Sequence, residues 1–349
     1  MISICLNMIV KNESKVIQRM LTSVINLIDY YVIVDTGSTD NTIECIQEFF
    51  KDTKVKGEIH QEKFINFGYN RTLAIKLAKD KCDYILLMDA DHILNYSDTF
   101  SKKQLIDYDE INISLKTGKM SYYLTRFVKG NIDIESIGVT HEYYKYEPHR
   151  NKKINLDNIW IVDKCDGGCR NEKFYRDEIL LKIEVEKNPN SRNLFYLAET
   201  LKNLKKYNEA ILIYTKCLKS NGWHEEIWYS YAMIAKCYIQ LDDEVNALYW
   251  TMEAYNFNQD RIENLYNLAI YYLQKKKKKL FLAMSDLAYG KKTTKSELFI
   301  EKDVYDFLFD YYRVIVYFYE KKDAEMIINE NLNKFNIPDL YYNNLYDNL

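Results

Sequence analysis

The sequence predicts two domains, an α/β domain built on a mixed β-sheet over residues 1–172 and an all-α domain of helix pairs over residues 173–349. Three observations support this division. The chain has 349 residues, and a domain typically takes about 150. The first hundred residues alternate between strand-like and helix-like periods, as in α/β domains. From about residue 173 onward the periods are helical, and small residues recur at a repeat-like spacing.

Composition and charge narrow the class of protein. Hydrophobic residues make up 47% and charged residues 28% of the chain, as in soluble globular proteins. The net charge of −3 provides no field that would recruit nucleic acid or an anionic membrane. Seven cysteines without a C-x-x-C pair favour a reducing compartment, so we expect a cytoplasmic protein. The sequence lacks the roughly 18 consecutive apolar residues that a transmembrane helix needs.

Strands and helices are expected to alternate through the first hundred residues. Apolar runs predict buried parallel strands at 2–10, 31–34 and 83–88, and a weaker one at 56–60. The first run lacks the basic residues of a signal peptide, which favours a strand. Helical spacing of apolar residues predicts helices at 14–29, 41–50 and 67–79, the second of them capped by Asp40. This alternation implies a parallel sheet covered on both faces.

Residues 111–163 have a different pattern. Segments 111–115, 121–128, 138–146 and 158–162 have the composition of strands joined by short turns. They predict an antiparallel or mixed extension of the sheet.

The second half carries a degenerate repeat close to 34 residues long. Ala235 follows Ala198 by 37 residues and Ala269 follows Ala235 by 34. Ala210 and Ala247 each come 12 residues after the first alanine of their pair. This spacing is typical of tetratricopeptide-like helix pairs, which must stack in groups of three or four to bury their apolar faces.

Two clusters of this half have competing interpretations. The five lysines at 275–279 fall in the turn of the third pair, where we favour a solvated turn over a phosphate-binding patch. An aromatic and acidic cluster is interpreted as packing between repeats, with stacking on a sugar ring as the alternative. It consists of Trp223, Glu225, Glu226, Trp228 and Tyr229.

Three polar loops follow predicted parallel strands: residues 11–13, residues 35–40, and Asp89-Ala90-Asp91. Ligands of open parallel sheets bind beyond the carboxyl ends of the strands, so these loops should converge on one pocket. Two carboxylates two residues apart in an extended chain point the same way. Mg²⁺ and Mn²⁺ prefer such oxygen ligands together with phosphates. Asp89 and Asp91 therefore predict a metal and diphosphate site in preference to a solvated turn.

Several stretches resemble a known family. SICLNMIVKNES, VIVDTGSTDNT, FGYNRTLA and YILLMDADH, in this order, resemble family 2 glycosyltransferases of the GT-A fold. GVTHEYYKY, CDGGCRNEKFYRD, NPNSRNLFYLAETL and GWHEEIWYS resemble a subgroup with a tetratricopeptide-like C-terminal half. The resemblance implies a Rossmann-like mixed sheet and a nucleotide-sugar donor, with a UDP-sugar expected. It implies transfer of a hexose with inversion to a hydroxyl of a glycan or protein.

The resemblance also implies which residues lie at the donor. They are Asn12, Glu13, Asp35, Asn70, Arg71 and Asp89. Asp35 would contact the base or ribose, and Arg71 would reach the diphosphate. The alternative for Arg71 is a surface arginine on a helix, and the alternative for Asn12 is a helix cap.

The pair His141-Glu142 supplies further candidates. The resemblance implies that His141 joins Asp89 and Asp91 in holding Mn²⁺ or Mg²⁺, whereas an ordinary core or surface histidine is the alternative. Glu142 is adjacent, but neighbouring side chains on a strand face opposite ways, so both serve one site only if the strand ends there.

Inversion requires a carboxylate that takes the proton of the acceptor hydroxyl. The candidates are Glu142, Asp163 and Asp166. Asp166 precedes two glycines, whose backbone can approach a ligand closely, although a turn between the domains would also explain them.

Two other functions remain open. A sugar-phosphate nucleotidyltransferase is disfavoured because the loop after the first strand lacks the glycines that would hold a triphosphate. The other is a non-catalytic repeat scaffold on a degenerate transferase domain. The helical half could bind the acceptor, cover the catalytic domain or mediate a homodimer.

Overall fold

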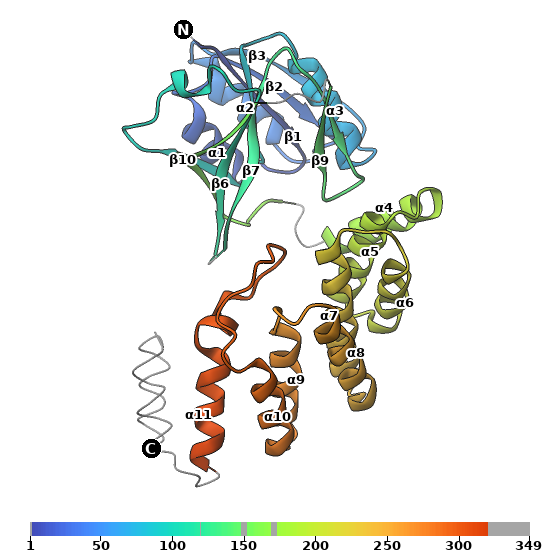
Figure 1. Cartoon of the computed structure of the whole chain (residues 1–349). Helices are drawn as coiled ribbons and strands as arrows, with labels where there is room; N and C mark the ends of the chain where they lie inside the picture. Colours follow the sequence, from blue (N-terminus) through green and yellow to red (C-terminus); the bar gives the residue numbers. More distant parts are fainter. Residues whose placement is uncertain (1, 119, 148–151, 169–172, 320–349) are drawn as a thin grey trace. The chain divides into compact units, whose positions relative to one another are not determined.

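The computed structural model describes residues 2–118, 120–147, 152–168 and 173–319. The chain divides by its internal contacts into two compact units, Met1–Leu180 and Leu181–Leu349 (Figure 1). The division falls inside helix α4 (Lys173–Lys187), whereas the sequence places the boundary at the start of that helix. The two units are described separately.

The first unit contains an eight-stranded sheet in the order β3-β2-β1-β4-β7-β6-β10-β5. The strands are β1 (Ile4–Val10), β2 (Tyr30–Asp35), β3 (Lys56–Gln61), β4 (Tyr84–Leu87), β5 (His92–Tyr96), β6 (Glu110–Thr117), β7 (Met120–Lys129) and β10 (Lys153–Asp163). The first four pair in parallel, as expected. Antiparallel β7 joins β4 to β6, which makes the sheet mixed.

Helices cover both faces of the parallel half. Helices α1 (Ile17–Val24) and α2 (Thr42–Lys51) pack on the face that carries the even-numbered side chains of β1. Helix α3 (Phe67–Ala78) packs on the opposite face. There Asn7 of β1 donates its side-chain amide to the carbonyl of Ala74 at 2.8 Å. Burial on both faces explains why β1 is a continuous apolar run without alternation.

Two features differ from the expected strands. The expected strand at 138–146 is right only from residue 143, since β8 (Asp133–Ile137) and β9 (Tyr143–Glu147) form a separate antiparallel hairpin around a turn. The turn forms because Gly138 and His141 adopt positive φ values of 114° and 52°. Strand β5 was not predicted. Only five residues long, it begins directly after the polar loop at 89–91 and pairs antiparallel with β10.

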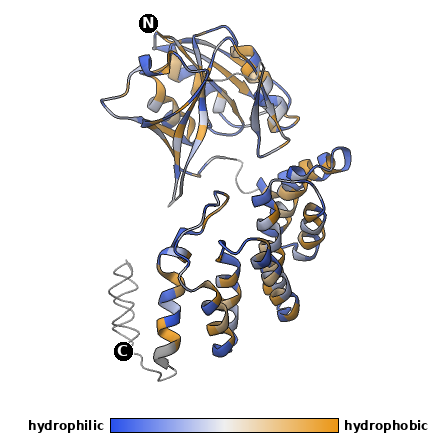
Figure 2. Ribbon diagram, in the orientation of Figure 1, coloured by the Kyte–Doolittle hydropathy of each residue, from blue (hydrophilic) through white to orange (hydrophobic). Residues whose placement is uncertain are grey.

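The second unit consists of helix pairs. The first helices of the pairs are α5 (Ser191–Asn203), α7 (His224–Gln240) and α9 (Glu263–Gln274). The second helices are α6 (Tyr207–Leu218), α8 (Glu244–Phe257) and α10 (Lys278–Ala288). A π-helical turn η2 (Val304–Leu308) then runs into α11 (Phe309–Tyr319). Hydrophobic and hydrophilic stretches alternate along these helices (Figure 2), as expected for amphipathic packing.

The turns between paired helices repeat the same geometry. Lys205, Asp242 and Lys276 have φ values of 60°, 58° and 59°. In each turn the next residue donates its backbone N–H to a carbonyl five residues back, at 2.8–2.9 Å. This is a Schellman-type cap, repeated at intervals of 37 and 34 residues. The alanines of the predicted repeat, from Ala198 to Ala269, are buried. The predicted tetratricopeptide-like arrangement is therefore confirmed.

The two ambiguous clusters of this unit are largely structural. Lys275 pairs with Asp242 at 2.6 Å, and Lys277 pairs with Glu244, so the lysine run is a turn paired to the preceding one. Trp228 is 2% exposed and lies beneath the guanidinium of Arg261.

Among the described residues, none of the helices is long and apolar enough to cross a membrane.

Candidate active site

A cleft of about 730 Å³ opens at the carboxyl ends of β1, β2 and β4 in the first unit. Its walls come from the polar loops after these three strands, the start of α3, Gly168 and Arg176. The lining residues are Ile9, Val10, Lys11, Asn12, Glu13, Thr36, Gly37, Thr39, Phe64, Phe67, Arg71, Asp89, Ala90, Asp91, Gly168 and Arg176. The three loops therefore converge on one cavity, as their positions after parallel strands predict.

Asp89 is held by two arginines. Its Oδ1 accepts a hydrogen bond from Arg71 at 2.5 Å, and its Oδ2 lies 3.4 Å from Nη1 of Arg126 on β7. Burial raises the pKa of the Asp89 carboxyl, but the charges of Arg71 and Arg126 and the hydrogen bond from Arg71 outweigh burial and hold that pKa well below its ordinary range. Asp89 is therefore ionised, and its charge is largely balanced by protein groups.

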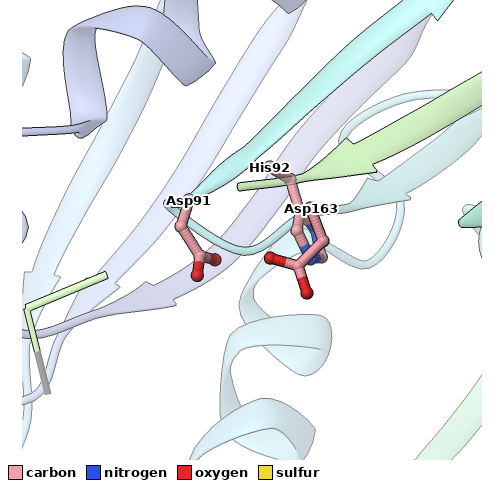
Figure 3. Close-up of side chains that lie close together, drawn as sticks. All are labelled: Asp91, His92 and Asp163. Carbon is pink, nitrogen blue, oxygen red and sulfur yellow. The ribbon is translucent and has the colours of Figure 1, made fainter. Parts of the chain in front are cut away.

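Asp91 lies in a different set of side chains. Ligand atoms of Asp91, His92 and Asp163 all lie within 4.8 Å of one another (Figure 3). Asp163 ends β10 and is the antiparallel partner of His92, the first residue of β5. The short strand β5 thus brings Asp163 to the Asp-x-Asp loop. The two carboxylates form an oxygen ligand set suited to Mn²⁺, and the His92 ring lies beside them.

The environment of His92 decides its protonation. The side chain is 5% exposed, and burial lowers its pKa to about 4, so the imidazole is neutral at pH 7. Nδ1 accepts the backbone N–H of Asp89 at 3.3 Å, and Nε2 lies 3.5 Å from Oδ2 of the same residue. Both ring nitrogens therefore face Asp89, so His92 orients the Asp-x-Asp loop.

Asn12 and Asp35 build the first two loops. Asn12, at a φ of 56°, accepts the backbone N–H of Thr39 on its side-chain oxygen at 2.7 Å. Asp35 is 2% exposed and accepts the backbone N–H groups of Gly37 and Ser38 at 3.1 Å. Asn12 thus fixes one loop to the other, and Asp35 folds the turn that lines the cleft. Asn41 occupies the N-cap position of α2 without a side-chain cap, whereas Asp40 accepts the backbone N–H of Thr42, the first residue of that helix, at 3.1 Å.

Glu13 is enclosed by the loop that follows β10. Its Oε2 accepts the backbone N–H of Gly168 at 3.0 Å. Burial raises the pKa of Glu13 to about 7, partly opposed by the Gly168 hydrogen bond and increased by the charge of Asp91. A Cβ on Gly168 would lie 1.8 Å from the carbonyl oxygen of Asn12. The glycine is thus required by close packing against the protein's own backbone.

The FGYNRTLA stretch contributes one residue to the cleft and one to its support. Arg71 lines the cleft, whereas Asn70 is fully buried. The Asn70 amide donates to the Lys63 carbonyl at 3.0 Å and accepts the Ile65 N–H at 2.9 Å. It therefore holds the loop that carries Phe64.

The three candidate bases lie in different surroundings. Asp166 forms a two-pronged ion pair with Arg19 at 2.6 and 2.8 Å on the surface. Asp163 accepts the backbone N–H of Cys165 at 2.7 Å. Glu142 is 17% exposed, and its Oε1 lies 3.5 Å from Nε of Arg71. This oxygen is buried and accepts no hydrogen bond from the described residues. Among the three, Glu142 has the least committed oxygen.

His141 lies in the turn before β9 and is outside the group formed by Asp91, His92 and Asp163. His92, Arg126 and Arg176 are site residues that sequence reasoning did not single out. His92 directly follows the Asp-x-Asp unit, which was an available signal. Arg126 stands on β7 without such a signal, whereas Arg176, on α4, lies within the stretch CDGGCRNEKFYRD and was not singled out there.

Comparisons with known proteins match the segment that supplies most of the cleft. Residues 5–104 match the family described as Glycosyl transferase family 2. Glycosyltransferase SunS of Bacillus phage SPbeta is 27% identical over 226 residues, covering 60% of this chain and 51% of SunS. The chain thus spans about half the length of SunS. Poly-beta-1,6-N-acetyl-D-glucosamine synthase of Staphylococcus epidermidis is 34% identical over 92 residues, covering 24% of this chain and 20% of the synthase.

Solved structures similar to parts of the chain include MamA, with a TM-score of 0.37 and 15% identity, covering 47% of this chain and 84% of MamA. The assignment of the helical unit rests on its own repeated turns and buried alanines. Residues 5–104 thus match glycosyltransferase family 2, in a chain that continues into tetratricopeptide-like helix pairs.

Proposed function

We propose that the protein is a metal-dependent inverting glycosyltransferase. It moves a sugar from a nucleotide sugar, with a UDP-sugar as the expected donor, to a hydroxyl of a glycan or protein acceptor. The observation that carries this proposal is the cleft itself, because it combines the family 2 segment with Asp89, Asp91 and Asn12 at one sheet edge. An open edge of this kind accommodates a nucleotide.

The residues present fit a divalent cation. Asp91 and Asp163 offer carboxylate oxygens that converge with the His92 ring, and hard cations such as Mn²⁺ and Mg²⁺ bind such oxygens. A bound cation would neutralise negative charge on the leaving nucleoside diphosphate. Asp89 would support this set from behind, because Arg71 and Arg126 already balance its charge. The proposed ligands are therefore Asp91 and Asp163 first, with the predicted roles of Asp89 and His141 secondary.

Glu142 is the proposed base. Its carboxylate would take the proton from an acceptor hydroxyl, and Arg71, whose Nε lies 3.5 Å from Oε1, would stabilise the ionised form before the proton arrives. Asp166 is less suited because Arg19 occupies both its oxygens. Asp35 and Asn12 would shape the nucleotide side of the cleft, and Asn70 would support it, by holding the loops described above.

A thermal-shift screen of nucleotide sugars with and without Mn²⁺ tests the proposal. A true donor should raise the melting temperature, because a ligand that binds the folded state stabilises it by mass action. Asp91→Asn should abolish the metal-dependent part of the shift and the transfer reaction. No shift with any nucleotide sugar would favour the non-catalytic scaffold. Release of pyrophosphate from a nucleoside triphosphate and a sugar phosphate would favour a nucleotidyltransferase.

The setting of the reaction is also proposed. The cysteines that the structure describes are free thiols, which agrees with a reducing cytoplasm. The helical unit would bind the acceptor or mediate a homodimer. Sedimentation of the purified chain, alone and with acceptor, would separate these two roles.

A further inference from the structure

The charged side chains of the cleft differ in how far they are already neutralised. The lining includes three acidic residues, Glu13, Asp89 and Asp91. It also includes three positively charged residues, Lys11, Arg71 and Arg176. A nucleoside diphosphate brings additional negative charge into this space. It needs cationic groups whose hydrogen-bonding capacity is not already taken by the acids of the protein.

Arg71 is largely committed to the protein. It bonds to Asp89 at 2.5 Å and lies 3.5 Å from the carboxylate of Glu142. Arg126 shares the same Asp89, at 3.4 Å, and is 8% exposed. Two arginines and two carboxylates thus form a group that is close to neutral as a whole. This group fixes the floor of the cleft and offers little uncompensated charge to an anion.

Arg176 is arranged differently. Its guanidinium carbon lies 4.6 Å from the centre of the Phe67 ring, so the ring supports one face of the group. Its Nε and Nη2 both bond to one oxygen of Asp177, at 3.2 and 3.1 Å. The side chain is 29% exposed, and no described residue accepts a hydrogen bond from its Nη1. The Phe67 ring and the Asp177 carboxylate thus hold the guanidinium of Arg176 in place while leaving its Nη1 donors available.

The buried partner of Arg176 explains its fixed position. Asp177 is 1% exposed, and one of its oxygens accepts no hydrogen bond among the described residues. Burial raises the pKa of Asp177, and the charge of Arg176 opposes that rise. The carboxylate therefore depends on this arginine, and in return it orients the guanidinium. A preorganised guanidinium loses little conformational entropy when it binds a second anion.

We propose that Arg176 binds the diphosphate of the nucleotide donor, on the cleft wall formed by Phe67 and the first turn of α4. This inference rests on the proposed function, since it assigns a ligand group within the same cleft. A planar fork with available donors matches phosphate oxygens, and charge-assisted pairs of this kind are strong. Arg176 occupies a face of Phe67, so that face is not open for stacking a nucleobase. The phosphates are therefore the part of the donor that Arg176 meets.

The test compares nucleotides that differ only in phosphate. UDP, GDP and ADP, and the matching nucleosides, are titrated calorimetrically into the full chain with Mn²⁺. For the diphosphate that binds, Arg176→Ala should weaken affinity about ten- to hundredfold, the range for charge-assisted hydrogen bonds. Affinity for the matching nucleoside should change less than about twofold. Arg176→Lys, which keeps the charge without the fork, should fall between wild type and Arg176→Ala.

Arg192→Ala is the matched control. Arg192 also stacks on a ring, 4.9 Å from the centre of Tyr196, and pairs with Glu226 at 3.7 Å, but it belongs to the helical unit. It should leave the affinity for the diphosphate unchanged. Equal losses for diphosphate and nucleoside in Arg176→Ala would indicate a structural role and overturn the inference, as would no loss at all. Failure of the wild type to bind any diphosphate would instead overturn the proposed function, and the inference with it.

Discussion

Asp89 and Asp91 are two residues apart, yet their partners give them different roles. Asp89 balances Arg71 and Arg126, and Asp91 faces Asp163. Neutralising Asp89 leaves Arg126 without its counter-charge and Arg71 with Glu142 alone, a loss that typically costs a few kcal/mol. Neutralising Asp91 removes a proposed metal ligand and relieves its repulsion with Asp163. The same substitution should therefore have opposite consequences for the stability of the fold at these two positions.

We expect Asp89→Asn to lower the free energy of unfolding by roughly 2–3 kcal/mol in the presence of a chelator. Asp91→Asn should leave it unchanged or slightly higher, while abolishing Mn²⁺ binding. Urea unfolding and calorimetric metal titration of both variants provide the measurement. Equal destabilisation by the two substitutions would contradict the division of roles.

Glu13 should make stability depend on pH. Burial raises its pKa from 4.5 to about 7, so the folded state binds the proton more tightly than the unfolded state. The stability that this proton contributes is fully present below about pH 4.5 and is lost as pH rises to about 7. Glu13→Gln should remove this part of the decline, so that the variant gains stability relative to wild type between pH 5 and pH 8.

Chemical unfolding of both proteins at pH 5 and at pH 8, in a chelating buffer, measures this difference in stability. Glu44→Gln, an exposed position on α2, serves as the control and should leave the pH dependence unchanged. A pH dependence of Glu13→Gln that parallels the wild type would show that Glu13 titrates normally.

Much of the site was predictable, because its residues stand beside strand ends that the sequence marks clearly. Asn12, Arg71, Asp89 and Asp91 all line the cleft. The convergence of Asp163 on the Asp-x-Asp loop was not predictable. It depends on β5, a strand too short to show a period of its own, and on pairing across about 70 residues. Pairing over such distances is set by tertiary packing and leaves no local pattern.

At the scale of elements, the loop after β10 closes on the loop after β1. A Cβ on Gly168 would meet the Asn12 carbonyl at 1.8 Å, whereas on Gly167 it would meet only side-chain carboxylate oxygens, at 3.3 Å. Carboxylate side chains can shift, but a backbone carbonyl within the first loop cannot without moving the cleft. Alanine substitutions at these two neighbouring glycines can therefore be compared directly, because only the one at Gly168 meets the backbone of the first loop.

Gly168→Ala should cost about 1–3 kcal/mol of stability, the usual range for overpacking, and should weaken binding of the nucleotide. Gly167→Ala should cost less than about 1 kcal/mol. Thermal unfolding with and without nucleotide measures both effects. A milder effect at Gly168 than at Gly167 would show that the two loops separate easily.

The turns between paired helices also lead to a prediction. Lys205 and Lys276 adopt a left-handed conformation that glycine occupies without strain. Replacing either lysine with glycine should raise stability by about 0.5–1 kcal/mol. Asp242 is the contrasting position, because its carboxylate accepts hydrogen bonds from Tyr271 and Lys275 at 2.8 Å. Asp242→Gly should therefore show a smaller gain or a loss, as measured by thermal unfolding.

The repeats were predictable for a different reason from the sheet. Each helix pair makes mostly local contacts, so the alanine spacing by itself reports the packing. The hairpin of β8 and β9 was the opposite case. Residues 138–146 were predicted as one strand because they carry no strong turn signal beyond Gly138. His141 helps to form the turn by adopting a positive φ, which is uncommon for a residue other than glycine.

For the whole molecule, strand order and chain order disagree. Strand β7 lies between β4 and β6, and β5 pairs with β10, so the segment 5–104 that matches the family lacks three strands of its own sheet. A fragment of residues 1–104 should therefore show no cooperative unfolding. A fragment ending at residue 187 should unfold in one transition. Circular dichroism during heating would decide, and a cooperative transition in the shorter fragment would contradict this view of the sheet.

This strand order has a consequence for synthesis on the ribosome. Glu13 meets Gly168, 155 residues later, and the cleft also needs Arg176. The nascent chain must therefore emerge past α4 before the cleft can close. Until β7 and β10 have emerged, strands β4 and β6 each lack a neighbour in the sheet, and such intermediates are prone to aggregate. Slower translation after residue 187, or a chaperone that holds the early strands, should raise the yield of active protein.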